Sequence, residues 1–279
     1  MLSADNMAGR KFASTESTQA QNYIIASLVN NNVQSFQKKY RHPFTFKSFI
    51  FEKEGNNIIG YVKGTRFPNQ YIVLSAHYDH LGQKGSKIYN GADDNASGTA
   101  AILAFAEAIA KQPLKYSVIF LFTDGEEVNL LGAKAFISQQ KLLLPQIKLN
   151  INIDMIAGSK STNKLYYIDK RLDTILPQDK IKHLRLLSNS SAIRIKRGFK
   201  GGGYRGNRTT SFINASDHAS FNRKHIPFIY FGVGEHKNYH TINDEFNNVN
   251  LSFFIHACQS IFQYLTFFDE NIEPVIIKT

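Results

Sequence analysis

Cysteine is almost absent from this sequence, which has Cys258 alone among its 279 residues. A single cysteine excludes an internal disulfide and a cysteine-rich zinc knuckle, so a metal site here must use histidines and carboxylates. Long apolar runs are also absent. No segment approaches the roughly 18 residues of a membrane span, and residues 1–20 lack the apolar centre of a signal peptide. We therefore expect no membrane span.

The composition is that of a folded protein. With 43% hydrophobic and 13% aromatic residues, the chain can bury one substantial core, which predicts a single α/β domain over residues 1–279. The net charge of +11 would attract polyanions or acidic substrates, but it is equally a common solubility device. The charge alone therefore assigns no partner.

Hydrophobic periodicity places the regular elements. Residues 22–33 are predicted as an amphipathic helix, and residues 44–53 and 58–63 as two strands joined by a turn at 55–57. Four short apolar runs follow, with helical patterns between and after them; the runs are 71–76, 117–122, 149–153 and 227–231, and the helical patterns are 96–111, 130–140 and 251–267. This alternation is typical of a largely parallel sheet covered by helices on both faces.

Metal-ligand residue types follow three of these strands. The first run ends in HYDH at 77–80, the second in DGEE at 124–127, and the third in Asp154. In an open α/β sheet, ligands bind beyond the carboxyl ends of the strands. We therefore expect these side chains at the same edge of the sheet.

Two loops add further candidates. Residues 91–98 read GADDNASG, which sets Asp93 and Asp94 just before a helix, and His240 lies in a polar loop before the last helix. One acid at such a position is explained by helix capping, and a lone histidine is more often a surface or core residue than a ligand. Capping does not explain two acids together with a His-x-Asp strand end, so the conjunction favours a metal centre.

The residue types suit two zinc ions. Two histidines and three carboxylates can hold two ions if one carboxylate bridges them, and the candidates are His77, Asp94, Glu127, Asp154 and His240. An aspartate two residues after a ligating histidine, as Asp79 is, can accept the other ring N–H and fix the tautomer. In the pair Glu126-Glu127, one carboxylate can ligate while its neighbour takes a proton from the attacking water.

Six motifs occur in the order of a known family. They are His77-Tyr78-Asp79, the 91–98 loop, Glu126-Glu127, Ile153-Asp154-Met155, Ser216-Asp217-His218 and Tyr239-His240-Thr241. From about Ala4 to about Phe267 the chain resembles the di-zinc exopeptidases that include secreted bacterial leucyl aminopeptidases, relatives of glutaminyl cyclase and glutamate carboxypeptidase. The resemblance implies a three-layer α/β/α sandwich with a mixed, mostly parallel sheet, the phosphorylase/hydrolase-like zinc exopeptidase fold. It also implies removal of N-terminal residues from peptides.

The resemblance assigns roles to individual residues. It implies that Asp94 bridges two zinc ions, with His77 and Asp154 on one and Glu127 and His240 on the other. It further implies that Glu126 is the general base for a water that bridges the metals, that Asp79 orients His77, and that the substrate pocket includes Asp217, His218 and Tyr239.

One position departs from the pattern. Some aminopeptidases of the family have a tyrosine three residues before the Ser-Asp-His motif to polarise the oxyanion, but this chain has Ile213. Tyr204 and Tyr239 are the candidates for that role.

Two alternative functions stay open. Within the same fold, the chain could be a glutaminyl cyclase-like acyltransferase with one zinc; from another class, a non-catalytic relative could bind a polyanion through the basic segment 194–208. We expect that segment to be a solvated loop near the cleft, and we expect no nucleic-acid partner. Members of the family are usually exported, which predicts a periplasmic or secreted enzyme. The oligomeric state is not predicted.

Overall fold

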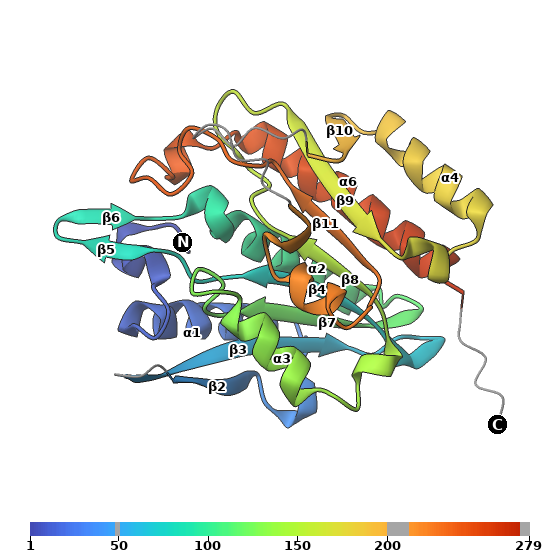
Figure 1. Ribbon diagram of the computed structural model, residues 1–279, viewed down its shortest axis with the longest axis horizontal. Coiled ribbons are helices and arrows are strands. Elements are labelled where there is room, and N and C mark those ends of the chain that lie inside the picture. Colours follow the sequence, from blue (N-terminus) through green and yellow to red (C-terminus); the bar gives the residue numbers. More distant parts are fainter. Residues whose placement is uncertain (48–50, 200–211, 274–279) are drawn as a thin grey trace.

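The protein is built around one β-sheet (Figure 1). The structure, a computed structural model, describes residues 1–47, 51–199 and 212–273. Within these residues nine strands pair in the order β1-β3-β7-β4-β8-β11-β9-β10, with β2 paired to β3. The strands are β1 (Gln34–Ser35), β2 (Arg41–Lys47), β3 (Glu52–Val62), β4 (Phe67–His77), β7 (Tyr116–Thr123), β8 (Ile147–Ile153), β9 (Lys164–Lys170), β10 (Arg194–Arg197) and β11 (Phe228–Gly232). A separate hairpin joins β5 (Gly82–Lys84) to β6 (Lys87–Tyr89).

Four parallel strands form the middle of the sheet. Strands β7, β4, β8 and β11 pair in parallel, whereas β3 joins β7 and β9 joins β11 in the antiparallel sense. Every residue of β7 and β8 is buried, as expected for strands covered on both faces. The predicted mixed sheet with its parallel centre is confirmed.

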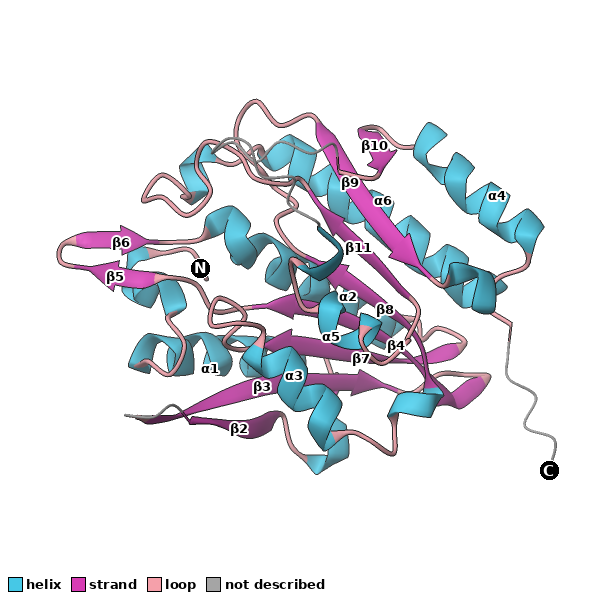
Figure 2. Ribbon diagram, in the orientation of Figure 1, coloured by secondary structure: helices cyan, strands magenta, loops and turns pink. Residues whose placement is uncertain are grey.

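Helices cover both faces of the sheet (Figure 2). The α-helices are α1 (Thr15–Asn30), α2 (Gly98–Lys111), α3 (Leu131–Gln139), α4 (Gln178–Leu186), α5 (His218–Asn222) and α6 (Leu251–Asn271). On β4, Ile72 and Leu74 pack in the core shared with α1, α2 and α6, whereas Val73 packs in the core shared with α3 and α5. This alternation has the two-residue period of a strand and produces the three expected layers.

Short helical turns connect these elements. They are η1 (Asp5–Arg10), η2 (Phe36–Lys38), η3 (Ala92–Ser97), η4 (Leu144–Gln146), η5 (Leu172–Thr174), η6 (Leu187–Asn189), η7 (Phe212–Asn214) and η8 (Phe246–Asn248). The helix predicted at 22–33 is α1, which begins earlier because Ser14 caps it: the Ser14 hydroxyl accepts the N–H of Ser17 at 3.1 Å.

The turn predicted at 55–57 is wrong. These residues continue β3, and β2 pairs with them in antiparallel register. Gly55 is there because its neighbours leave no room for a side chain: a Cβ would lie 2.4 Å from the ring of Phe12 and 2.6 Å from that of Phe44. The glycine therefore marks close packing within a strand, not a reversal of the chain.

The basic segment 194–208 begins with a strand, where a loop was expected. Its first four residues form β10, parallel to β9, and Arg197 forms an ion pair with Asp169 at 2.7 Å. Residues 200–208 lie outside the described residues. Among the helices that the structure describes, none has the length and apolar character needed to cross a bilayer.

Candidate metal centre

The ends of three parallel strands converge. His77 is the last residue of β4 and is in register with Thr123, the last residue of β7, after which the chain reaches Glu127. Asp154 directly follows β8, and Met155 then turns the backbone with a φ of 60°. Positive φ in a non-glycine residue is uncommon and clusters at functional sites.

One group of donors surrounds the side chain of His77. Its Nε2 atom lies 3.3 Å from Asp94 Oδ1 and 3.3 Å from Asp154 Oδ1. The other ring nitrogen, Nδ1, lies 3.1 Å from the backbone oxygen of Asp79, which fixes the ring orientation. His77, Asp94 and Asp154 therefore present three potential metal-binding atoms to one point.

A second group surrounds the other oxygen of Asp94. His240 Nε2 lies 3.1 Å from Asp94 Oδ2 and 3.3 Å from Glu127 Oε2. His80 joins this group, with its Nδ1 atom 2.9 Å from Glu127 Oε1. Asp94 thus lies between two clusters, one oxygen facing each. The sequence analysis did not select His80, although it lies three residues after His77 in the same strand-end motif.

The adjacent acids of the 91–98 loop have different partners. Asp93 is completely buried; it accepts hydrogen bonds from His236 Nε2 at 2.8 Å and from the backbone N–H of Ala157 at 2.7 Å. Asp244 accepts the backbone N–H groups of Asp93 and Asp94, at 2.8 and 3.0 Å. Asp93 and Asp244 therefore hold the loop in place, which leaves the carboxylate of Asp94 to face the histidines.

A buried arginine holds two of the loops that carry the donors, the one after β4 and the one that leads to Asp94. Arg10, at the end of η1, donates from Nε to the carbonyl of Tyr78 at 2.7 Å and from Nη1 to those of Leu2 and Asn90, at 2.6 and 2.7 Å. Its Nη2 atom donates to the carbonyl of Gly91 at 3.1 Å. Burial lowers the pKa of Arg10 to about 10, which still leaves it charged at neutral pH. The start of the chain is thereby attached to both loops.

The buried carboxylate of Asp79 fixes the glutamate pair. Its two oxygens accept the backbone N–H groups of Glu126 at 3.1 Å and Glu127 at 3.4 Å. The distance from Asp79 Oδ1 to His77 Nδ1 is 3.7 Å, which is too long for a hydrogen bond. Asp79 therefore orients His77 through its backbone carbonyl, and its side chain positions the segment that carries the two glutamates.

Negative charge dominates this centre. Burial raises the pKa of Glu126 well above its usual value, and the charges of Asp154 and Glu127 raise it further. Burial would lower the pKa of His77, but Asp154 and Glu126 outweigh it and raise that pKa well above its ordinary range. In the described part of the chain, no lysine or arginine forms an ion pair with Asp94, Glu127 or Asp154. Buried carboxylates of this kind require a cation or a proton.

The Ser-Asp-His motif lies beneath the centre. Asp217 and His218 are completely buried. The hydroxyl of Thr123 donates to Asp217, and His218 Nε2 lies 2.9 Å from the carbonyl oxygen of Phe212. Burial lowers the pKa of His218 to about 3, so the ring is neutral. Both side chains have protein partners and no exposed surface, which differs from the pocket-wall position expected for them.

Two tyrosines flank the donors. Tyr239 stacks on His240 with ring centroids 3.9 Å apart, and burial followed by the charge of Asp94 raises its pKa. Tyr230, in β11, was not selected from the sequence; it is buried, and burial followed by the charge of Asp154 raises its pKa well above the usual value. Tyr204 lies outside the described residues.

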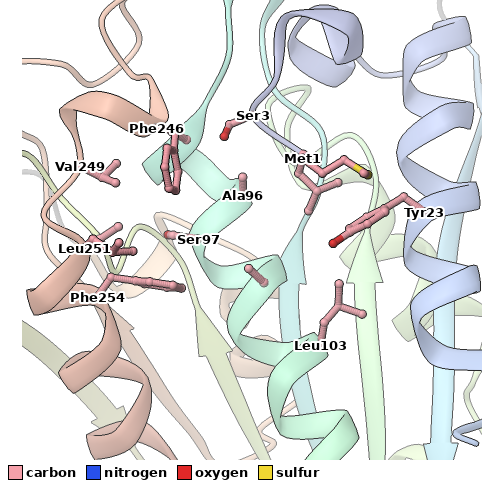
Figure 3. A pocket seen from close by; sticks show the side chains of 14 residues that line it. Met1, Ser3, Tyr23, Ala96, Ser97, Leu103, Phe246, Val249, Leu251 and Phe254 are labelled. Carbon is pink, nitrogen blue, oxygen red and sulfur yellow. The ribbon is translucent and has the colours of Figure 1, made fainter. Parts of the chain in front are cut away.

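A separate apolar pocket of about 140 Å³ borders the 91–98 loop (Figure 3). Ala96 and Ser97 line it, together with Tyr23 of α1 and Phe254 of α6. None of the histidines and carboxylates described above is among its lining residues. The pocket is therefore distinct from the metal centre.

Comparison with known proteins identifies the family. A model described as peptidase family M28 matches residues 57–265. The chain belongs to peptidase family M28. The match covers the strands that carry the donors and most of the last helix, and it confirms the resemblance to the exopeptidase group drawn from the sequence motifs.

Curated relatives of this M28 chain match it over part of their length. A probable zinc metalloprotease from Pyrenophora tritici-repentis is 30% identical over 124 residues, which are 43% of this chain and 29% of that protein. A probable leucine aminopeptidase 2 from Aspergillus oryzae is 26% identical over 171 residues, 58% of this chain and 33% of that protein. The chain spans about a third of the length of these relatives.

The fold is also found in solved structures. The crystal structure of a glutaminyl cyclase from Macrostomum lignano superposes with a TM-score of 0.71 at 19% identity, covering 98% of this chain and 89% of that chain. At this identity the likeness concerns the fold alone. It agrees with the predicted α/β/α architecture.

Proposed function

We propose that this M28 chain is a zinc-dependent aminopeptidase that hydrolyses the N-terminal peptide bond of peptides. The position of Asp94 carries the proposal, because its two oxygens face two separate histidine-carboxylate groups. A carboxylate shared by two ions suits the paired sites of metallohydrolases. The proposed ligands are Asp94 as the bridge, His77 and Asp154 for the first ion, and Glu127 and His240 for the second.

The donor set fits zinc. Imidazole nitrogens and carboxylate oxygens are common ligands of this ion. The donors of His77, Asp94 and Asp154 lie within 4.8 Å of one another. In the second group, Glu127 Oε1 is buried and has no hydrogen-bond partner among the described residues, a state that a cation would relieve. The relative from Pyrenophora tritici-repentis, named a probable zinc metalloprotease, supports the same metal.

Zinc bound here would polarise the substrate carbonyl and lower the pKa of the attacking water. Glu126 is proposed to accept the proton of that water and to deliver it to the leaving amine. The raised pKa of Glu126 suits this role, because a carboxylate that titrates closer to neutral pH can both accept and release a proton. Asp79 holds the backbone of Glu126 for this purpose.

Substrate contacts are assigned to the exposed side of the centre. Tyr239 is proposed to contact the substrate beside His240, and to donate to the oxyanion in place of the tyrosine replaced by Ile213. Asp217 and His218 are proposed to support the pocket from beneath, because both are buried. Residues 1–279 are proposed to form one catalytic domain.

Hydrolysis of aminoacyl-anilides before and after chelation tests the proposal. Exhaustive chelation is expected to abolish turnover and zinc to restore it, with elemental analysis approaching two zinc ions per chain. Undiminished turnover by metal-free protein would exclude the mechanism. The leucine aminopeptidase name of the relative from Aspergillus oryzae makes the leucyl anilide the first substrate to assay.

A peptide with N-terminal glutamine separates the alternative within this fold. Cyclisation of that peptide, together with one zinc per chain and no anilide hydrolysis, would replace the aminopeptidase proposal with a glutaminyl cyclase-like one. Binding of a polyanion without turnover of either substrate would favour a non-catalytic relative.

A further inference from the structure

The imidazole ring of His80 is buried and makes no hydrogen bond to the described residues. His80 follows β4 in the loop that leads to β5, and its side chain has 1% of its surface exposed. Among the described residues, neither Nδ1 nor Nε2 has a hydrogen-bond partner. Buried polar atoms are nearly always satisfied, so an unpartnered imidazole at a charged centre requires an explanation.

The ring nitrogen Nδ1 converges with carboxylate oxygens on one point. It lies 2.9 Å from Glu127 Oε1 and 3.6 Å from Asp94 Oδ2. Two donors that bind the same zinc ion at about 2.0 to 2.2 Å are separated by about 3.3 Å in a tetrahedral shell. Both distances are close to that separation. The short contact to Glu127 lacks hydrogen-bond geometry, so both atoms are buried and without a hydrogen-bond partner among the described residues.

The surrounding backbone holds the ring in this place. Gly91 packs against it: a Cβ on Gly91 would lie 2.5 Å from Cγ of His80, and the φ of 56° also favours glycine there. The carbonyl of Gly91 is in turn fixed by Arg10. His80 is therefore packed tightly by residues that have no direct contact with the proposed ions.

We propose that His80 Nδ1 is an additional ligand of the second zinc ion, alongside Asp94, Glu127 and His240. The inference rests on the proposed two-ion site. It makes the two sites unequal: the second has four protein ligands, whereas the first has three, namely His77, Asp94 and Asp154. Closed four-ligand zinc sites are structural, and sites with three protein ligands keep an open position for water or substrate. The ion held by Asp94, Glu127, His240 and His80 is then expected to bind more tightly and to dissociate more slowly. The open position for water or substrate belongs to the ion held by His77, Asp94 and Asp154.

Cobalt titration of the metal-free chain, residues 1–279, tests this inference. Cobalt reports coordination through its visible absorption, so the two sites can be followed without turnover. The wild-type chain is expected to fill in two steps, with the tighter step lost in His80→Asn. Loss of a ligand should weaken that site at least about 100-fold, since even partners outside the ligand shell contribute about 10- to 100-fold to metal affinity.

Replacement by asparagine distinguishes a histidine that binds the metal from one that only hydrogen-bonds to a metal ligand. The side-chain amide of asparagine keeps an N–H donor near the position of Nδ1. If His80 only donated a hydrogen bond to Glu127, the substitution would therefore change the cobalt affinity less than about tenfold. The matched control is His42→Gln: His42 is also buried, but it hydrogen-bonds to the carbonyls of Phe36 and Lys39, and both cobalt steps should be unchanged. Circular dichroism of each metal-free variant checks the fold.

Equal cobalt binding by His80→Asn and wild type would overturn the inference and leave the aminopeptidase proposal intact. Loss of the tighter step in His80→Asn, in a chain that hydrolyses no anilide, would support the ligand and overturn the proposed function. A single cobalt step of two equivalents in the wild-type chain would overturn the unequal pair. A single step of one equivalent would overturn the two-ion site as well.

Discussion

Replacing Arg10 with methionine is expected to destabilise the protein and loosen its metal centre together. Arg10 is completely buried, and its guanidinium donates to four backbone carbonyls, two of which belong to the loop that leads to Asp94. Methionine can fill the space of the aliphatic part of the arginine side chain but carries no donor. The carbonyls of Leu2, Tyr78 and the loop at 90–91 would lose these partners.

The magnitude follows from the number of carbonyls. The carbonyl of Gly91 also accepts the backbone N–H of Ala96 at 3.1 Å, so three carbonyls are left unpaired. A buried acceptor left unpaired costs about 1 to 3 kcal/mol, so three give an upper range of about 3 to 9 kcal/mol. Removing the guanidinium also ends its own desolvation cost, and water can enter to reach some carbonyls. A net loss of about 3 to 5 kcal/mol is therefore expected, as when one partner of a buried charged contact is removed. For a chain of this size that lowers Tm by about 6 to 20 °C.

Thermal unfolding followed by circular dichroism measures this loss, and chelator competition measures zinc retention. Arg10→Lys should be intermediate, because a single ammonium nitrogen keeps the charge but cannot reach all four carbonyls. Arg194→Met, at an exposed position of β10, is the matched control. If Arg10→Met shifts Tm no more than this control and releases zinc no faster, the reasoning about the buried carbonyls is refuted.

Three further outcomes are expected. Glu126→Gln should lower kcat by about 10²- to 10⁴-fold with both metals bound, whereas Glu127→Gln should lose metal. If elemental analysis showed metal loss in Glu126→Gln and not in Glu127→Gln, the roles of base and ligand assigned to the two glutamates would be exchanged. Tyr239→Phe should lower kcat about 10²-fold with little change in KM, and unchanged kcat would remove it from the oxyanion. Burial and then the charge of Asp79 raise the pKa of Asp124 to about 8, so the metal-free folded state keeps a proton that the unfolded chain releases between about pH 4 and 8. Stability therefore falls as the pH rises through this window, and Asp124→Asn should raise the Tm of metal-free protein more at pH 8 than at pH 5; an equal rise at both would contradict the shift.

The positions of the donors in the fold could be predicted because the ends of the strands could be predicted from the sequence. Each of the residues His77, Glu127 and Asp154 follows a short apolar run, and parallel strands bring such residues to one edge. The family motifs added the order and the proposed roles. These predictions rest on local patterns, which a single sequence displays.

Other parts depended on packing that no local pattern shows. Gly55 suggested a turn, but the rings of the distant Phe12 and of Phe44 in the paired strand β2 occupy the space where its side chain would be. His80 carried no separate signal, because its approach to Glu127 requires a contact between two strand ends. Asp93 and Asp94 have different partners because Asp93 binds His236 and the backbone N–H of residue 157, both far along the chain.

Substrate preference and compartment stay predictions. The periplasmic or secreted location was inferred from the family resemblance alone. The oxyanion role of Tyr239 also remains a proposal.

The distribution of the proposed ligands along the chain has a kinetic consequence. His77 and His240 are about 160 residues apart in sequence, and β8 lies between β4 and β11 in the sheet. The ligand set is therefore complete only after the long-range strand pairs have formed, which is slow compared with local folding. Interactions that form after the transition state slow unfolding and leave the folding rate unchanged. Free zinc should accordingly extend the lifetime of the folded protein without accelerating its formation.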